Sequence, residues 1–103
     1  MDTQLKKGVL ELAILFQIRD EEQYGYEIMK RIRQEFPEVY EGSVYAILRR
    51  LAAEGLAAPV LRPSDFGPPR KYYCLTPSGR ERLRDSLAEW AALREGLSRL
   101  GLP

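Results

Sequence analysis

The 103-residue sequence contains no histidine, and its single cysteine is Cys74. Without histidine the chain cannot build a histidine acid–base pair, a Ser-His-Asp triad or a Cys/His zinc site. With one cysteine it cannot form an internal disulfide, and we expect Cys74 to be a small buried residue in a strand. Carboxylates are numerous, but no paired acid–base motif or phosphate-cradling glycine loop accompanies them. We therefore expect no catalytic residues, no metal and no cofactor.

A strong net charge and long apolar runs are also lacking. Sixteen Lys and Arg against 15 Asp and Glu give a net charge of +1, which taken as a whole does not favour nucleic-acid binding. Residues 62–84 depart from this balance, with six basic residues against two acidic ones. The N-terminal apolar run is interrupted by Lys6, Lys7 and Glu11. We therefore expect no signal peptide or membrane span, and a cytoplasmic protein.

Apolar spacing and helix-end signals predict three helices, a hairpin and a last helix. The first three helices are expected over residues 5–18, 24–36 and 43–54, with Ser43 as the N-cap of the third. Strands are expected over 56–61 and 71–75, separated by a Pro- and Gly-rich stretch. Thr76 is a natural N-cap for the last helix, with Pro77 at its first position.

This order is that of a winged helix-turn-helix, in which the third helix enters the DNA major groove and the hairpin, or wing, follows the backbone. We expect a mostly helical fold with a small two-stranded hairpin. Residues 1–76 would form the DNA-binding domain, and residues 77–103 a C-terminal dimerisation helix.

The third helix and the hairpin both carry candidate DNA-binding side chains. Outside the apolar stripe of the third helix lie Ser43, Tyr45, Ala46, Arg49 and Arg50. The hairpin brings Arg62, Arg70 and Lys71 together near its tip, and Pro68 and Pro69 stiffen the loop. A solvated basic surface would give the same pattern, so the fold context is what favours phosphate contact.

Four stretches resemble, in their order and spacing, the PadR family of winged-helix transcriptional regulators: LKKGVLELAIL, YGYEIMKRI, GSVYAILRRLAAEGL and GPPRKYYCLTPSGRERL. The single last helix is similar to the compact subfamily. The resemblance implies a homodimeric regulator, usually a repressor, that binds an inverted repeat in double-stranded DNA and is released by a small molecule or stress signal. With the residues carried over by position, the candidate DNA-binding set is Tyr24, Ser43, Val44, Tyr45, Arg49, Arg62, Arg70 and Lys71.

Several tyrosines have a competing role, because tyrosine rings more often pack in a core with the hydroxyl at its edge. We expect core packing for Tyr26 and Tyr73. For Tyr24 and Tyr45, both core packing and DNA contact stay open.

The first and last helices carry more apolar residues than one small core can cover. The last helix has Leu83, Leu87, Trp90 and Leu97 at heptad-like spacing. This pattern predicts that the two helices pack against those of a second chain, and the resemblance implies the same dimer. The candidate dimer residues are Leu5, Gly8, Leu12, Leu87, Trp90 and Leu97.

Trp90 has two compatible roles. Its position matches a tryptophan that stacks on flat aromatic ligands in multidrug-sensing members of the family, so the resemblance allows a small aromatic effector beside Gly8. An interface anchor is the simpler interpretation, because tryptophan is common at dimer interfaces.

A winged helix that binds protein instead of DNA is the alternative function. Glu35, Glu38 and Glu41 precede the third helix and Glu54 follows it. These carboxylates would repel phosphate if they faced the DNA, so the positions of Glu38 and Glu41 discriminate between the two functions.

Overall fold

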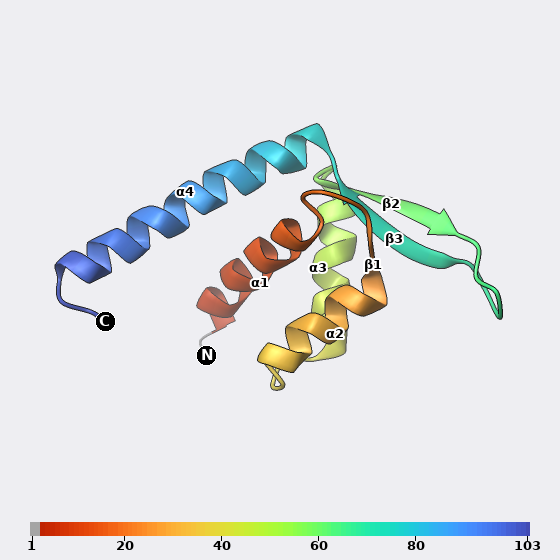
Figure 1. Cartoon of the computed structure of the whole chain (residues 1–103), viewed down its shortest axis with the longest axis horizontal. Coiled ribbons are helices and arrows are strands. Elements are labelled where there is room, and N and C mark those ends of the chain that lie inside the picture. Colours follow the sequence, from red (N-terminus) through yellow and green to blue (C-terminus); the bar gives the residue numbers. More distant parts are fainter. Residues whose placement is uncertain (1–2) are drawn as a thin grey trace.

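The computed structural model describes the backbone from Thr3 and the side chains from Lys7 to Pro103. Four helices pack with a small sheet (Figure 1). The helices are α1 (Thr3–Gln17), α2 (Gly25–Glu35), α3 (Glu41–Ala53) and α4 (Pro77–Arg99). The strands are β1 (Gln23–Tyr24), β2 (Ala57–Arg62) and β3 (Arg70–Leu75), antiparallel in the order β1-β3-β2. The predicted winged-helix fold is confirmed.

Strand β1 was not predicted, and it ties the start of α2 to the wing. Gln23 pairs with Tyr73 of β3, and Tyr24 pairs with Tyr72. Tyr24 is therefore extended (φ −68°, ψ 128°), and α2 begins one residue later than expected, at Gly25. A Cβ at Gly25 would lie 3.2 Å from the Tyr73 ring, so the absence of a side chain permits this close approach.

Helix α3 begins at Glu41, two residues before the predicted start. Its N-cap is Tyr40, and the prediction that Ser43 caps the helix is wrong, because Ser43 lies within the first turn. The backbone N–H of Ser43 donates to the carbonyl of Tyr40 (3.0 Å). Placing Glu41 in the first turn puts its negative charge at the favourable end of the helix dipole.

The hydrophobic core lies among α1, α2, α3 and the part of the sheet around Ala57 and Tyr73. Its fully buried side chains are Ile14, Leu15, Ile18, Ile28, Val39, Val44, Leu48 and Leu51. Tyr73 is buried as predicted, whereas Tyr26 is 45% exposed, so its predicted core position is wrong. Cys74 lies in β3 as predicted but is only half-buried. In α1 the core-facing residues leave Phe16 on the outside.

Helix α4 starts at the predicted signal. The Thr76 hydroxyl accepts a hydrogen bond from the backbone N–H of Gly79 (3.0 Å) and donates one to the carbonyl of Gly55 (2.6 Å). Leu83 joins the core. Beyond it α4 runs past α1, and its last turns project from the rest of the fold (Figure 1). The division of the chain at residue 76 remains a prediction. Among the helices described, none combines the length and apolar character needed to cross a membrane.

Candidate nucleic-acid interface

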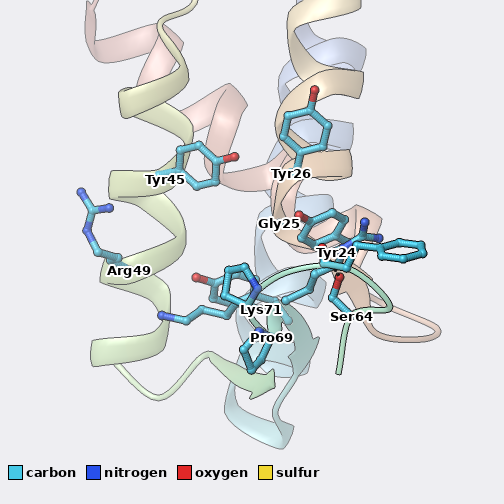
Figure 2. Close-up of a pocket in the computed structure, with 12 residues that line it drawn as sticks. Tyr24, Gly25, Tyr26, Tyr45, Arg49, Ser64, Pro69 and Lys71 are labelled. Atoms are coloured by element: carbon cyan, nitrogen blue, oxygen red, sulfur yellow. Dashed lines mark hydrogen bonds between the residues drawn. The ribbon is translucent and has the colours of Figure 1, made fainter. Parts of the chain in front are cut away.

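A groove of about 510 Å³ lies between the first turn of α2, the outer face of α3 and the wing (Figure 2). We call it the wing groove. Five of the eight predicted DNA-binding residues line it, namely Tyr24, Tyr45, Arg49, Arg70 and Lys71. Figure 2 shows Tyr45 pointing from α3 toward α2, Arg49 on the other side of α3, and Lys71 and Pro69 of the wing at the end of the groove. The fold thus brings together side chains from three separate elements.

The wing groove carries three cations. Among the side chains that the structure describes, no carboxylate forms a salt bridge with Arg49, Arg70 or Lys71. Their charges are therefore available to an anion from outside the chain. Concentrating one sign of charge along a groove raises the local potential well above that expected from a net charge of +1.

Tyr24 holds the wing against α2. Its ring stacks on that of Tyr72, with 5.3 Å between centroids and 27° between planes. The Arg70 guanidinium carbon lies 5.0 Å from the Tyr24 ring centroid, a cation–π contact. Tyr24 is half-buried, so packing and a surface role coincide: the ring orients Arg70 at the edge of the groove.

Tyr45 also combines packing with access to the groove. Its ring packs partly against the core, and Figure 2 shows it projecting from α3 toward α2. Burial, followed by the charge of Glu41, raises the pKa of the Tyr45 hydroxyl above its ordinary value. The hydroxyl is protonated at neutral pH, as an ordinary tyrosine is, and can donate a hydrogen bond to a phosphate.

Two predicted DNA-binding residues, Val44 and Arg62, differ from expectation in the structure. Val44 is 0% exposed and packs in the core, so the prediction that its side chain contacts DNA is wrong. Val44 belongs to the apolar stripe of α3, and this stripe faces the core. Arg62 lies opposite Arg70 in the hairpin, near the tip as expected. Its guanidinium, however, donates two hydrogen bonds to the Glu22 carboxylate (2.7 and 2.9 Å), so its charge is already paired.

The acidic residues around α3 do not line the wing groove. Glu41 forms a salt bridge with Arg33 (3.3 Å), and it borders a different cavity. Glu54 binds Arg50 on α3 (2.7 Å). Glu38 is exposed ahead of the helix. The pairing of Glu41 and Glu54 with arginines removes most of the support for the protein-binding alternative.

Phe66 lines the wing groove and was not predicted. It is a large apolar residue within the Pro-, Gly- and Ser-rich loop between β2 and β3. A large apolar residue in an otherwise polar loop was the feature of the sequence that could have identified Phe66. Loop residues are expected to be polar, so a phenylalanine in this loop differs from its neighbours.

A second groove, of about 280 Å³, lies between α1 and α4, and we call it the helix groove. It brings together three of the predicted dimer residues, Gly8, Leu12 and Trp90, and the carboxylates of Glu11 and Glu89 also line it. Leu87 and Leu97 are exposed on α4 but lie outside the groove lining. The predicted contact of Leu5 concerns a side chain outside the described residues. Within the described part of the chain, no cluster of acidic or cysteine side chains could hold a metal ion.

Comparison with known proteins places this geometry in a family. A family model described as the transcriptional regulator PadR-like family matches residues 14–85. The crystal structure of a Streptococcus transcriptional regulator is similar, with a TM-score of 0.85 and 35% identity over 96% of this chain and 98% of that one. A PadR-like transcriptional regulator from Bacillus cereus has a TM-score of 0.83 and 39% identity, over 95% of this chain and 96% of that one.

Two further proteins are also similar to this chain. Bacillus subtilis PadR in complex with operator DNA has a TM-score of 0.67 and 30% identity, over 77% of this chain and 46% of that one. An uncharacterised protein of Lysinibacillus sphaericus is 30% identical over 92 residues, which is 86% of this chain and 84% of that protein. The chain therefore belongs to the PadR-like family, whose members are transcriptional regulators and not enzymes.

Proposed function

We propose that this regulator binds an inverted-repeat operator as a homodimer, with α3 in the major groove and the wing along the phosphate backbone, and that it acts as a repressor in the cytoplasm. The observation that carries the proposal is the wing groove. Arg49, Arg70 and Lys71 lie there without salt-bridge partners among the described side chains, between the helix and the hairpin that a winged helix applies to DNA. The similarity to the operator-bound Bacillus subtilis PadR supports the same use of the fold.

The roles of the residues follow from their positions. Arg49 projects from the exposed face of α3, where a guanidinium can bind a guanine edge through two hydrogen bonds. Ser43 and Tyr45, near the start of α3, can donate hydrogen bonds to phosphate. Arg70 and Lys71 extend from β3 and would contact the backbone without reading sequence. Arg62 contributes less than Lys71 in this proposal, because Glu22 already binds its guanidinium.

The homodimer is supported by the apolar surface of α4. Leu87, Trp90, Leu93 and Leu97 are all exposed along this helix, and an apolar stripe of this length is unfavourable in water unless another surface covers it. A second copy, packed with its α1 and α4 against those of the first, would cover this stripe symmetrically. Two-fold symmetry would then place the two α3 helices on half-sites about 34 Å apart.

The helix groove is the candidate place for an effector. Trp90, 42% exposed, borders it beside Gly8, at which an added Cβ would meet nothing within 4 Å. A flat aromatic compound could stack on the indole in that space. Titration of a panel of planar aromatic compounds should quench Trp90 fluorescence, and failure of the whole panel to quench it would contradict an effector site here.

A salt series tests DNA binding directly. The DNA is the region upstream of the protein's own gene, and log affinity is measured against log salt. Affinity should fall steeply with salt, and Arg70→Ala and Lys71→Ala should each flatten the slope by about one unit, because each variant neutralises one phosphate fewer. Arg99→Ala is the matched control, since Arg99 lies at the far end of α4 and pairs with Glu95. Absent or salt-independent binding would contradict the proposal.

A further inference from the structure

The tip of the wing presents a large apolar side chain to solvent. Phe66 is 96% exposed, the highest value among the large apolar side chains that the structure describes. Full exposure of a phenyl ring forgoes the free energy that its burial would provide. Single exposed apolar side chains are common, so the inference also depends on the loop that carries Phe66 and on the charges around it.

The backbone of the loop around Phe66 is restricted. The Ser64 hydroxyl donates a hydrogen bond to the carbonyl of Phe66 (3.3 Å). Gly67 adopts φ +114°, a conformation that glycine permits. Pro68 and Pro69 follow directly and restrict the backbone on the return to β3. These features reduce the backbone conformational entropy that the loop would lose on binding.

The surroundings of Phe66 indicate what kind of surface it meets. It lines the wing groove together with Arg49 and Lys71, and it borders a smaller cavity with Arg70. Three cations thus line the two cavities that Phe66 borders. Asp65 is the acidic residue within the tip loop and opposes this field by one charge. An apolar ring among cations suits a polyanion with an apolar interior, which is the chemistry of a DNA duplex.

We propose that Phe66 is an apolar wedge that enters the DNA minor groove beside each half-site, packs against the sugar edges and partly unstacks one base step. This inference rests on the proposed function, because it presumes that α3 occupies the adjacent major groove. Minor-groove binding proteins use phenylalanine in this way, and the partial unstacking kinks the duplex by about 20–90°. The wedge would favour a flexible pyrimidine–purine step at that position.

The test measures affinity, salt slope and DNA bending for the full-length chain on its upstream DNA. Phe66→Ala should weaken binding by about tenfold or more, because the variant loses the free energy gained when the phenyl ring is buried. It should reduce the bend seen by electrophoresis of circularly permuted fragments, and leave the salt slope unchanged because no charge is removed. Phe66→Leu should restore much of the affinity and bend. Leu61→Ala is the matched control, since Leu61 is exposed on the same hairpin but lines neither cavity beside Phe66.

The outcomes separate this inference from the proposed function. If the wild-type chain binds its DNA and Phe66→Ala matches it in affinity and bend, the wedge is overturned and DNA binding stands. If affinity falls with no change in bend, the wedge is also overturned and Phe66 is a simple groove contact. If the wild-type chain shows no salt-dependent DNA binding, both proposals fail together.

Discussion

The guanidinium of Arg50 in α3 donates a hydrogen bond of 2.9 Å to the carboxylate of Glu11 in α1. Arg82 of α4 reaches the same carboxylate, at 3.4 and 3.5 Å. The Glu11 side chain is 17% exposed and lines the helix groove. One carboxylate therefore connects the helices proposed to form the dimer with the helix proposed to read DNA. It also holds Arg50 toward α1, which leaves Arg49 as the arginine of this pair in the wing groove.

Replacing Glu11 should weaken the connection between these helices. We expect Glu11→Gln to lower the free energy of unfolding by about 1 kcal/mol, because the charged acceptor of two arginines becomes neutral. DNA affinity should fall as well, since α3 is then held less firmly against α1. Denaturant unfolding and the DNA-binding assay measure the two effects.

Glu95→Gln is the matched control for Glu11→Gln. Glu95 binds Arg99 on an exposed part of α4, and a surface pair of this kind contributes within about 0.5 kcal/mol. Equal effects of the two substitutions on both stability and DNA affinity would contradict a role for Glu11 in joining the helices.

Gly79 lies in the first turn of α4, which packs against the backbone of Leu56 just before β2. A Cβ at this position would lie 1.9 Å from the carbonyl oxygen of Leu56, a backbone atom that cannot move aside alone. We expect Gly79→Ala to cost about 2–4 kcal/mol, as an overpacking substitution that shifts backbone. Urea unfolding measures this loss of stability. An unchanged m-value would show that the variant exposes the same amount of surface on unfolding as the wild type.

Gly96 provides the control within the same helix, since a Cβ there would meet nothing within 4 Å. Gly96→Ala should stabilise the protein by up to about 1 kcal/mol through helix propensity. A Gly79→Ala variant as stable as Gly96→Ala would show that α4 does not approach Leu56 as described.

The ion pair of Glu22 and Arg62 gives a prediction about pH. The Arg62 hydrogen bonds hold the pKa of the Glu22 carboxyl below its ordinary value of 4.5. A pKa lowered in the folded state means that the pair stabilises the fold above the unfolded-state pKa, and that this contribution is lost as pH falls through the folded-state pKa. In an NMR titration, Arg62→Ala should raise the pKa of Glu22 toward its ordinary value. An unchanged titration of Glu22 would show that the two side chains do not pair in solution.

Trp90 should control the association of two chains. Truncation of a tryptophan at the centre of an interface typically costs about 2 kcal/mol or more, which corresponds to a dissociation constant raised about 30-fold. Sedimentation equilibrium of Trp90→Ala measures this change, with Arg99→Ala as the control on the same helix. A variant that dimerises as tightly as the wild type would place the interface elsewhere.

The element order was predictable because local signals mark the ends of the elements. Gly55, with φ +74°, ends α3 as expected, and Thr76 with Pro77 begins α4. Strand β1 was not predictable, because two residues are too few to show an alternating pattern and their extended form depends on pairing with β3. Tyr26 was wrongly expected in the core: the buried face of α2 comprises Gly25, Ile28, Met29 and Ile32, and helical periodicity turns residue 26 away from it.

The candidate site was predictable where charge and fold order agreed, as for Arg49, Arg70 and Lys71. Val44 was taken from a positional match, although its own apolar stripe placed it inside, and it is buried. The pairing of Arg62 with Glu22 joins residues 40 positions apart, so neither local spacing nor charge counting could show it. Phe66 was overlooked because a lone apolar residue in a polar loop gives no periodic pattern.

Selection from a random DNA library, followed by measurement of the number of chains bound per duplex, tests the central claim most directly. The proposal predicts enrichment of an inverted repeat whose half-site centres lie about one helical turn, or a multiple of it, apart. It also predicts two chains per repeat and loss of the enrichment with Arg49→Ala. Recovery of no common sequence, or of a single half-site occupied by one chain, would contradict a symmetric dimer that reads DNA through α3.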